Sequence, residues 1–429
     1  GTTLLTYLAG RFVEQSSSKA QRKWGVAGFL ALAVGTLFVF KYYNFFTSQL
    51  NEVFGLSIPI SKLLLPVGIS FYLFQAMSYV LDVYWGRHKA DSLRTVALYL
   101  AFFPKLAAGP IDRAEELAPQ FDEVHTFDYD RVVNGLRLMM WGAFKKIVIA
   151  DRLAMIVDLV YGDPTNHTGL ALTLATLAYT IQIYADFSAY TDVARGTAQV
   201  LGFRLTENFR QPYFATSIND FWRRWHMSLS FWFRDYLYIP LGGNRVSVPR
   251  WALNIVVVFL VCGLWHGSNW TFVVWGGLHG LYIVGGRFTK PVRERLADIV
   301  GLNRVPVARR VIQTVLTFCL VAFAWLFFRA KDMSTAWYIT SHLFTGWYFD
   351  PTFLKALIAS LGVAEGEWIV ILVTLALLVL VDVGHLRRDL FTWFAQRPVW
   401  FRWAVYCGLA WGIFVLGVFG KTEFIYVTF

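Results

Sequence analysis

Charged side chains are scarce in this sequence. Only 16% of its 429 residues are Asp, Glu, Lys or Arg, whereas soluble domains carry about 25%. A soluble chain of this length would also tend to divide into about three domains, yet no polar linker separates one part of the sequence from another. We therefore exclude a disordered chain and a string of soluble domains, and we expect residues 1–429 to form a single transmembrane domain.

Cysteines are few as well. Cys262, Cys319 and Cys407 all lie within apolar runs, and no two of them have the CxxC spacing of a metal or redox pair. An odd number excludes a complete disulfide framework, so we interpret the three as small buried residues. The GxSxG nucleophile motif and the Walker A phosphate-binding motif are also missing, which removes two common enzyme signatures.

Apolar and aromatic residues dominate what is present: 56% of the chain is hydrophobic, with 18 Trp, 20 Tyr and 38 Phe. Because a spanning helix needs about 20 apolar residues, we expect an all-α membrane protein with about ten or eleven membrane segments. The clear candidates are residues 24–46, 61–84, 251–265, 271–285, 311–328, 368–383 and 401–419. Residues 93–108, 132–161 and 170–203 are less clear, and the last of these is expected to make two passes. The opening TTLLTYLAG reads as the end of a helix, so further N-terminal helices are expected upstream.

The net charge of +11 comes from Lys and Arg clusters between the apolar runs. Such clusters mark cytoplasmic loops, which places residues 11–23, 87–94, 290–310 and 387–388 in the cytoplasm. No basic stripe or reading motif indicates a nucleic-acid partner. The aromatic segment 330–366 then lies outside, as a docking face for a partner or as an interfacial belt. Residues 132–161 are too charged for a simple span, and we expect them to lie partly along the interface.

Residues 217–245 (SINDFWRRWHMSLSFWFRDYLYIPLGGNR) are densely aromatic and also charged. Trp222, Trp225, Leu229 and Trp232 follow helical spacing, which predicts one face of an amphipathic helix at or within the membrane surface. The Pro and Gly residues from position 240 onward are expected to end this helix.

Residues 262–280 (CGLWHGSNWTFVVWGGLHG) also interrupt the apolar pattern. Both flanks are basic, so residues 251–286 must enter the membrane and return, with turn chemistry at the midpoint, residues 267–269. His266 therefore precedes a break in a membrane helix, where an ionisable group is a functional candidate. A neutral imidazole there can activate a hydroxyl to attack a thioester, with Trp265 and neighbouring tryptophans walling a dry pocket. A satisfied packing histidine is the alternative.

Other polar residues give less specific indications. Asp186 and Asp192, in IYADFSAYTDVARG, are either hydrogen-bonded structural carboxylates or groups that orient a base or line an acyl path. His226, His266 and His279 could in principle ligate zinc, but they lack HExxH spacing and companion ligands. We therefore expect no metal site.

Together these motifs resemble the membrane-bound O-acyltransferase (MBOAT) family, and most of all its branch of bacterial alginate O-acetylation membrane proteins. The resemblance rests on IQIYADFSAYTDVARG, FWRRWHMSLSFWFRDYLYIPLGGNR and above all CGLWHGSNWTFVVWGGLHG. GISFYLFQAMSYVLDV and FFPKLAAGPIDR also fit, and the similarity extends from residue 4 to the end of the chain.

The resemblance implies that His266 is the catalytic base and that His226 is a second important site. It implies a ring of tilted helices around a thinned centre, with a cytoplasmic tunnel meeting an outer funnel near His266. The donor would be acetyl-CoA, a substrate and not a bound cofactor. Its acetyl group would cross the bacterial inner membrane to an extracytoplasmic hydroxyl, and periplasmic partner acetyltransferases of SGNH type would modify an alginate-like exopolysaccharide.

Individual roles follow as hypotheses within this resemblance. We expect Arg223 and Arg224 to meet the CoA phosphates, and Asn269 or a backbone N–H to stabilise the oxyanion. His266 acts as a base or as a covalent relay, and His226 holds the donor or passes protons on.

Two other functions stay open. The D-alanyl transfer proteins of teichoic acid share the FWxRWHxSLSxWFRD pattern and draw on a carrier-protein thioester, although YIPLGGNR favours the alginate-like branch. A polytopic transporter or flippase would also contain broken helices and buried charge, but no pair of broken segments recurs in the two halves of this sequence.

Overall fold

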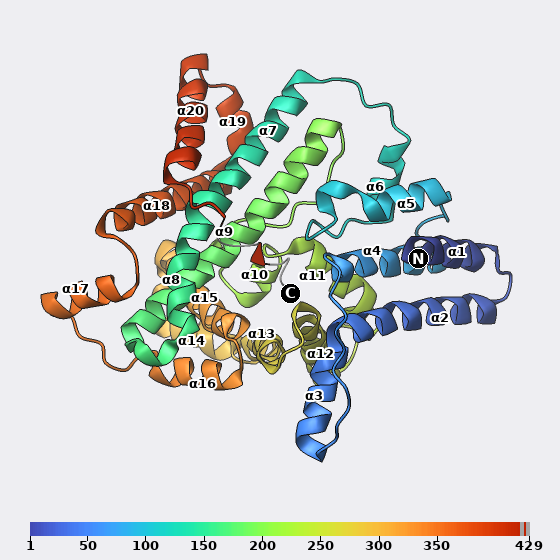
Figure 1. Ribbon diagram of the computed structural model, residues 1–429, viewed down its shortest axis with the longest axis horizontal. Coiled ribbons are helices and arrows are strands. Elements are labelled where there is room, and N and C mark those ends of the chain that lie inside the picture. The colour runs from blue at the N-terminus through green and yellow to red at the C-terminus, as the bar shows by residue number, and fades with distance from the viewer. Residues whose placement is uncertain (421–423, 426–429) are drawn as a thin grey trace.

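The protein is a bundle of helices at many inclinations, described here by a computed structural model that covers residues 1–420, 424 and 425 (Figure 1). No strand occurs in this part of the chain, so the all-α expectation is confirmed. Six helices are long and apolar enough to span a membrane, which supports a multi-pass membrane protein. They are Lys19–Phe54 (α2 Lys19–Leu37, η1 Phe38–Tyr42 and α3 Tyr43–Phe54), α9 Gly169–Leu201, α12 Val248–His266, α15 Pro306–Arg329, α18 Glu365–Arg387 and α20 Val399–Leu416. The larger number of segments, the ring and the tunnel stay predictions.

Shorter helices pack around these six. The α-helices are α1 Thr2–Gln15, α4 Ile69–Tyr84, α5 Leu93–Ala101, α6 Ala114–Leu117, α7 Tyr129–Phe144, α8 Asp151–Gly162, α10 Ile218–Trp222, α11 Met227–Phe233, α13 Trp270–Phe288, α14 Lys290–Ile299, α16 Met333–His342, α17 Pro351–Ser360 and α19 Leu390–Ala395. Single-turn and π-helical pieces link them: η2 Phe103–Lys105, η3 Ala118–Phe121, η4 Lys145–Ala150, η5 Pro164–Asn166, η6 Pro212–Phe214, η7 Arg234–Tyr238 and η8 Leu302–Arg304.

The expectation of two passes in residues 170–203 was wrong. This stretch is one helix, α9, of 33 residues, which at 1.5 Å per residue is about 50 Å long. A helix of that length exceeds an apolar layer of about 30 Å, so it must be tilted or extend beyond the layer. In Figure 1, α9 runs obliquely beside α7 through the middle of the molecule.

Buried ion pairs explain why α9 continues without a break. Lys145 Nζ lies 2.8 Å from Asp192 Oδ2, and Lys146 Nζ lies 2.7 Å from Asp186 Oδ1. The lysines come from η4, the π-helical link between α7 and α8. Both lysines are at least nine-tenths buried, so their charge is neutralised inside the protein and not displayed at a membrane interface. Residues 132–161 appear too charged for a membrane helix because Asp186 and Asp192, which pair with these lysines, lie elsewhere in the sequence, in α9.

Two other expected spans have different limits from those read in the sequence. The helical part of residues 61–84 begins only at Ile69, in α4. The helical part of residues 93–108 ends at Ala101, in α5. At 16 and 9 residues these helices are shorter than a typical span of about 20 residues.

The hairpin expected in residues 251–286 is confirmed. Helices α12 and α13 are antiparallel neighbours joined by residues 267–269. Their backbones meet at two glycines: a Cβ added to Gly263 would lie 2.2 Å from Phe272 O, and one added to Gly276 would lie 2.2 Å from Phe259 O. Only glycine permits this close approach, which sets the position of the end of α12.

The amphipathic helix expected in residues 217–245 was wrong as a single element. The chain forms α10, a break at His226, α11 and then η7. His226 has a left-handed backbone with φ 42°, which an L-residue cannot propagate as a helix. Trp222, Trp225, Leu229 and Trp232 are all buried, so they are part of the protein core and do not form a membrane-facing stripe.

Candidate active site

His266 is the last residue of α12, and the chain turns away at Gly267. Its side chain is buried, with only 2% of the residue exposed. Aromatic rings surround it: the ring centroids of Trp265, Trp275 and Phe328 lie 4.8, 5.0 and 5.3 Å away. Aromatic rings therefore do surround His266, while a dry pocket and a role in chemistry stay predictions.

His226 packs near the same tryptophan, Trp265. The Trp265 ring is 6.3 Å from the ring of His226 and 4.8 Å from the ring of His266. His226 is fully buried and also packs against Phe71 and Phe187. Two histidines that are 40 positions apart in the sequence thus both pack near one indole.

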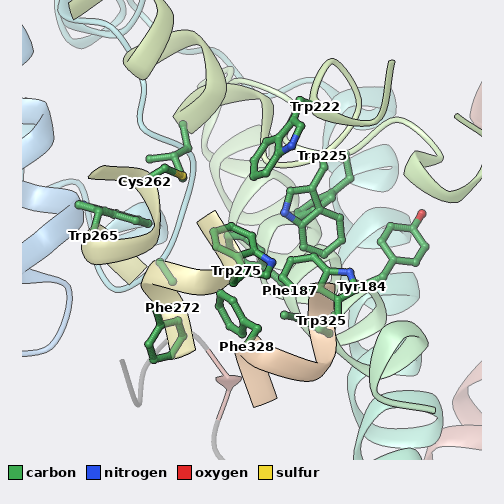
Figure 2. Close-up of a cluster of buried hydrophobic side chains, with 14 of the residues drawn as sticks. Tyr184, Phe187, Trp222, Trp225, Cys262, Trp265, Phe272, Trp275, Trp325 and Phe328 are labelled. Atoms are coloured by element: carbon green, nitrogen blue, oxygen red, sulfur yellow. The ribbon is translucent and has the colours of Figure 1, made fainter. Parts of the chain in front are cut away.

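A cluster of tryptophans extends from this pair into the core (Figure 2). Trp275, Trp325 and Phe328 gather at the centre of the view, and Trp265 lies apart from them on the opposite side of the hairpin. The rings of Trp275 and Trp325 stack at 5.5 Å. His279, one turn after Trp275 on α13, accepts a hydrogen bond from Trp222 Nε1 at 3.2 Å. In the described residues no three His, Cys, Asp or Glu side chains converge as a metal site.

The sequence reasoning missed Lys41. Its ammonium donates to the carbonyl oxygens of Trp265 and His266, at 2.6 and 3.1 Å, and lies 5.8 Å from the Trp265 ring centroid. The carbonyls at a helix C-terminus lack helical partners and carry partial negative charge, so Lys41 caps α12 at the candidate catalytic residue. The sequence does contain a signal for this residue. Lys41 is a lone lysine inside the apolar run 24–46, and an ionisable residue within a membrane segment is a functional candidate.

Two cavities lie at different levels of α12. A small one of about 20 Å³ contains His266 together with Lys41, Gly68 and Phe71. A larger groove of about 420 Å³ follows α12 from Trp251 to Cys262. Cys262 lies one helical turn before His266, on the same face of α12.

Two arginines line the larger groove, but they are not Arg223 and Arg224, the pair expected from the sequence. Arg223 and Arg234 line it, and both are exposed. Arg224 instead pairs with Asp220 at 2.8 Å. Arg234 pairs with Asp235 at 2.6 Å. In the described part of the chain no carboxylate lies within ion-pair distance of Arg223, so its charge is available to a ligand.

The carboxylate of Asp235 pairs with Arg234, which lines the larger groove, and with Arg113. Burial alone would raise its pKa, but Arg234 and Arg113 outweigh burial and hold the pKa of Asp235 below its usual range. Arg113 Nη2 lies 2.6 Å from Asp235 Oδ2. The carboxylate of Asp235 therefore stays charged and remains paired with Arg234. Of the two arginines that line the groove, Arg223 is the one better able to bind an anion.

Asn269 caps the next helix. Its Oδ1 accepts from Thr271 N at 3.2 Å, and its Nδ2 donates to Lys331 O at 2.9 Å. Both ends of the amide are therefore engaged at the N-terminus of α13. This arrangement favours a structural role for Asn269 over the expected contact with an oxyanion.

Asp186 and Asp192 are structural in this conformation. Besides its pair with Lys146, Asp186 accepts a hydrogen bond from Ile425 N at 2.7 Å. Asp192 pairs with Lys145 and lies 3.9 Å from Arg195. The two carboxylates join α7, η4 and α9, and the structural alternative read from the sequence is the one that these contacts favour.

Comparisons with known proteins extend these observations. The sequence profile of the MBOAT (membrane-bound O-acyltransferase) family matches residues 91–328. The chain is 40% identical over 352 residues to a probable alginate O-acetylase of Pseudomonas aeruginosa, and the alignment covers 80% of this chain and 65% of that protein. It is 33% identical over 364 residues to a peptidoglycan O-acetyltransferase of Helicobacter pylori, with 78% and 67% covered.

A more distant relative is a teichoic acid D-alanyltransferase of Bacillus subtilis, 26% identical over 285 residues, with 64% of this chain and 71% of that protein covered. The chain thus spans about two thirds of the length of these relatives. The matched residues include both histidines and the α12–α13 hairpin. The chain belongs to the membrane-bound O-acyltransferase family.

Proposed function

We propose that the protein is an O-acetyltransferase that takes an acetyl group from a cytoplasmic thioester and delivers it toward an extracytoplasmic hydroxyl. One observation carries this proposal: the buried His266 lies in a small cavity at the end of α12, and a separate groove approaches along α12 to within one turn of it. We propose that the groove brings a donor toward His266 and that the small cavity admits the acceptor.

The groove suits an acyl-CoA. Its walls are largely apolar, from Trp251, Val258 and Phe259, and Arg223 stands exposed beside them. Arginine binds phosphate oxygens through paired N–H donors, while the pantetheine arm and acetyl group are slender enough to follow an apolar channel. Acetyl-CoA is the proposed donor, bound as a substrate.

The proposed step moves one proton and one acyl group. His266 takes the proton of the acceptor hydroxyl, and the oxygen attacks the thioester carbonyl. The C–S bond then breaks, the ester forms, and the thiolate leaves and regains a proton as the free thiol. In the alternative, the imidazole nitrogen attacks first and holds the acetyl group until the hydroxyl displaces it. His226, whose ring packs near Trp265, is proposed to hold the donor or to pass protons.

The acceptor is proposed to be an exopolysaccharide of the alginate type, reached through periplasmic SGNH-type acetyltransferases at the bacterial inner membrane. The names of the 40% identical relatives support a polysaccharide hydroxyl. Peptidoglycan is a second acceptor suggested by the name of the Helicobacter relative. D-alanyl transfer to teichoic acid is the third possibility, suggested by the Bacillus relative.

Transfer of a labelled acetyl group tests the proposal. The purified protein in nanodiscs is given acetyl-labelled CoA or a D-alanyl carrier-protein thioester, with alginate or peptidoglycan fragments and a periplasmic SGNH protein. We expect label transfer from acetyl-CoA, and a loss of about 10²–10⁴-fold in His266→Ala, the usual contribution of a general base.

His342→Ala is the matched control, since His342 lies in α16, away from both cavities. Full transfer by His266→Ala at normal membrane levels would overturn the role of this residue. Transfer from the carrier-protein thioester alone would replace acetylation by D-alanylation. Movement of glycan or lipid without acyl transfer would favour a transporter.

A further inference from the structure

A third cavity lies outside the candidate active site, between α7 and the last three helices. It measures about 540 Å³, and its walls are almost wholly apolar or aromatic. Leu377 and Leu380 of α18, Trp393 of α19, and Tyr406 and Leu409 of α20 line it. In Figure 1, α19 and α20 stand beside the upper end of α7, at the edge of the molecule. The helices that line the cavity therefore lie at the periphery of the molecule.

Positive charge is concentrated at one end of this groove. Arg388 and Arg397 lie on the Trp393 ring, with guanidinium carbons 5.2 and 4.6 Å from its centroid. Arg402, in the first turn of α20, lies at the same end because α19 joins the end of α18 to the start of α20. Within the described residues, none of these three arginines has a carboxylate within ion-pair distance, and Asp389 is engaged in capping α19.

A fourth arginine reaches into the groove wall. Arg137 of α7 is only 8% exposed. Its Nε donates to Tyr406 Oη at 2.6 Å and its Nη1 to Asn134 Oδ1 at 2.7 Å. These partners are neutral, and no acidic side chain of the described chain pairs with it. A buried guanidinium without an anion is costly, so the site is electrostatically complementary to an anionic group.

We infer that this groove binds one anionic phospholipid, with an acyl chain along α18 and α20 and its phosphate among the arginines near Trp393. The shape supports a lipid over a protein helix. A volume of about 540 Å³ is in the range of small-molecule pockets, about 300–1,000 Å³. The groove is large enough for one acyl chain, with the rest of the lipid outside it, whereas a spanning helix about 10 Å wide and 30 Å long does not fit. Basic pockets between membrane helices on the cytoplasmic side recognise anionic headgroups.

Native mass spectrometry of the whole purified chain in mild detergent tests the inference. The probes are dioleoyl-phosphatidylglycerol and the zwitterionic dioleoyl-phosphatidylcholine. We expect one phosphatidylglycerol to be retained in preference, with the preference falling about fivefold for each arginine removed. Arg388→Gln with Arg397→Gln removes the two headgroup contacts. Arg295→Gln with Arg310→Gln is the matched control, since both arginines are exposed and line neither the groove nor the candidate active site.

A second variant keeps every arginine and fills the groove. Val405→Trp places a large ring among the lining residues, and we expect it to weaken both lipids, whereas the double arginine variant weakens only the anionic one. Equal retention of the two lipids by the wild type would overturn the inference. Unchanged phosphatidylglycerol binding in Val405→Trp would place the lipid elsewhere. If the arginine variant does not fold, the Val405→Trp result decides alone.

Discussion

The ammonium of Lys41 lies 3.1 Å from the carbonyl oxygen of His266 and donates a hydrogen bond to it. The two residues are 225 positions apart in the chain, and Lys41 lies outside the region that the family profile matches. The bond ties the candidate catalytic residue to the N-terminal helices. Lys41 therefore acts as a positioning residue, since it touches the backbone that carries the imidazole.

Lys41→Met should lower acetyl transfer by roughly 10–100-fold, because a shift of about 1 Å in a reacting group has effects of this size. Lys41→Arg should restore much of the rate, since arginine can cap the same carbonyls. The measurement is kcat and KM for acetyl-CoA. We expect the loss in kcat, with KM little changed.

A double-mutant cycle separates positioning from general damage. In the His266→Ala background, Lys41→Met should cost nothing further, because its effect acts through His266. A further loss of the same size in that background would contradict the positioning role and indicate that Lys41 supports the fold as a whole.

His226 combines a left-handed backbone with a buried ring, and substitutions can separate the two. His226→Gly relieves a conformation that costs an L-residue about 1–2 kcal/mol and removes the imidazole. We expect its melting temperature to exceed that of His226→Ala, yet both variants should lose transfer. Activity retained by His226→Gly would show that only the backbone turn matters at this position.

The close packing of α12 against α13 requires glycine at position 276 but not at position 285. Gly276→Ala would place a Cβ 2.2 Å from Phe259 O, and overpacking of this kind typically costs about 1–3 kcal/mol. We expect a lower melting temperature and weaker transfer, because the end of α12 must shift. Gly285→Ala, in the same helix with open space around it, is the control and should be neutral. Equal effects of the two variants would indicate that only helix propensity changed.

The loop between α4 and α5 gives a pH-dependent prediction. His88 Nε2 lies 2.6 Å from Asp91 Oδ2; this hydrogen bond outweighs burial and raises the pKa of His88 above its ordinary value of 6.5. A raised folded-state pKa means that the stabilisation is present in full below about pH 6.5 and is lost as pH rises through the raised value. Melting temperature should therefore fall more steeply above about pH 6.5 in the wild type than in His88→Gln. Parallel curves for the two proteins would contradict the assignment.

Local pattern was enough to predict several parts of the structure. The α12–α13 hairpin follows from basic flanks around an apolar run with a Gly-Ser-Asn midpoint, and His266 lies at the break as expected. The same local reasoning failed where charges were paired across the fold. Residues 170–203 were expected to make two passes, but they form one helix, α9, whose Asp186 and Asp192 pair with Lys146 and Lys145. Helical spacing around Trp225 predicted one helix, because spacing contains no information about the left-handed turn at His226.

By itself, the sequence determined the membrane class, the helical content, the hairpin and the position of His266 at its break, because these depend on composition and on short-range spacing. Only the tertiary structure decided that His226 and His266 both pack near Trp265, that Lys41 caps α12, and that Arg223 and not Arg224 is available at the groove. Each of these depends on side chains brought together from distant segments. Long-range packing selects such partners, and no local pattern in the chain encodes the choice.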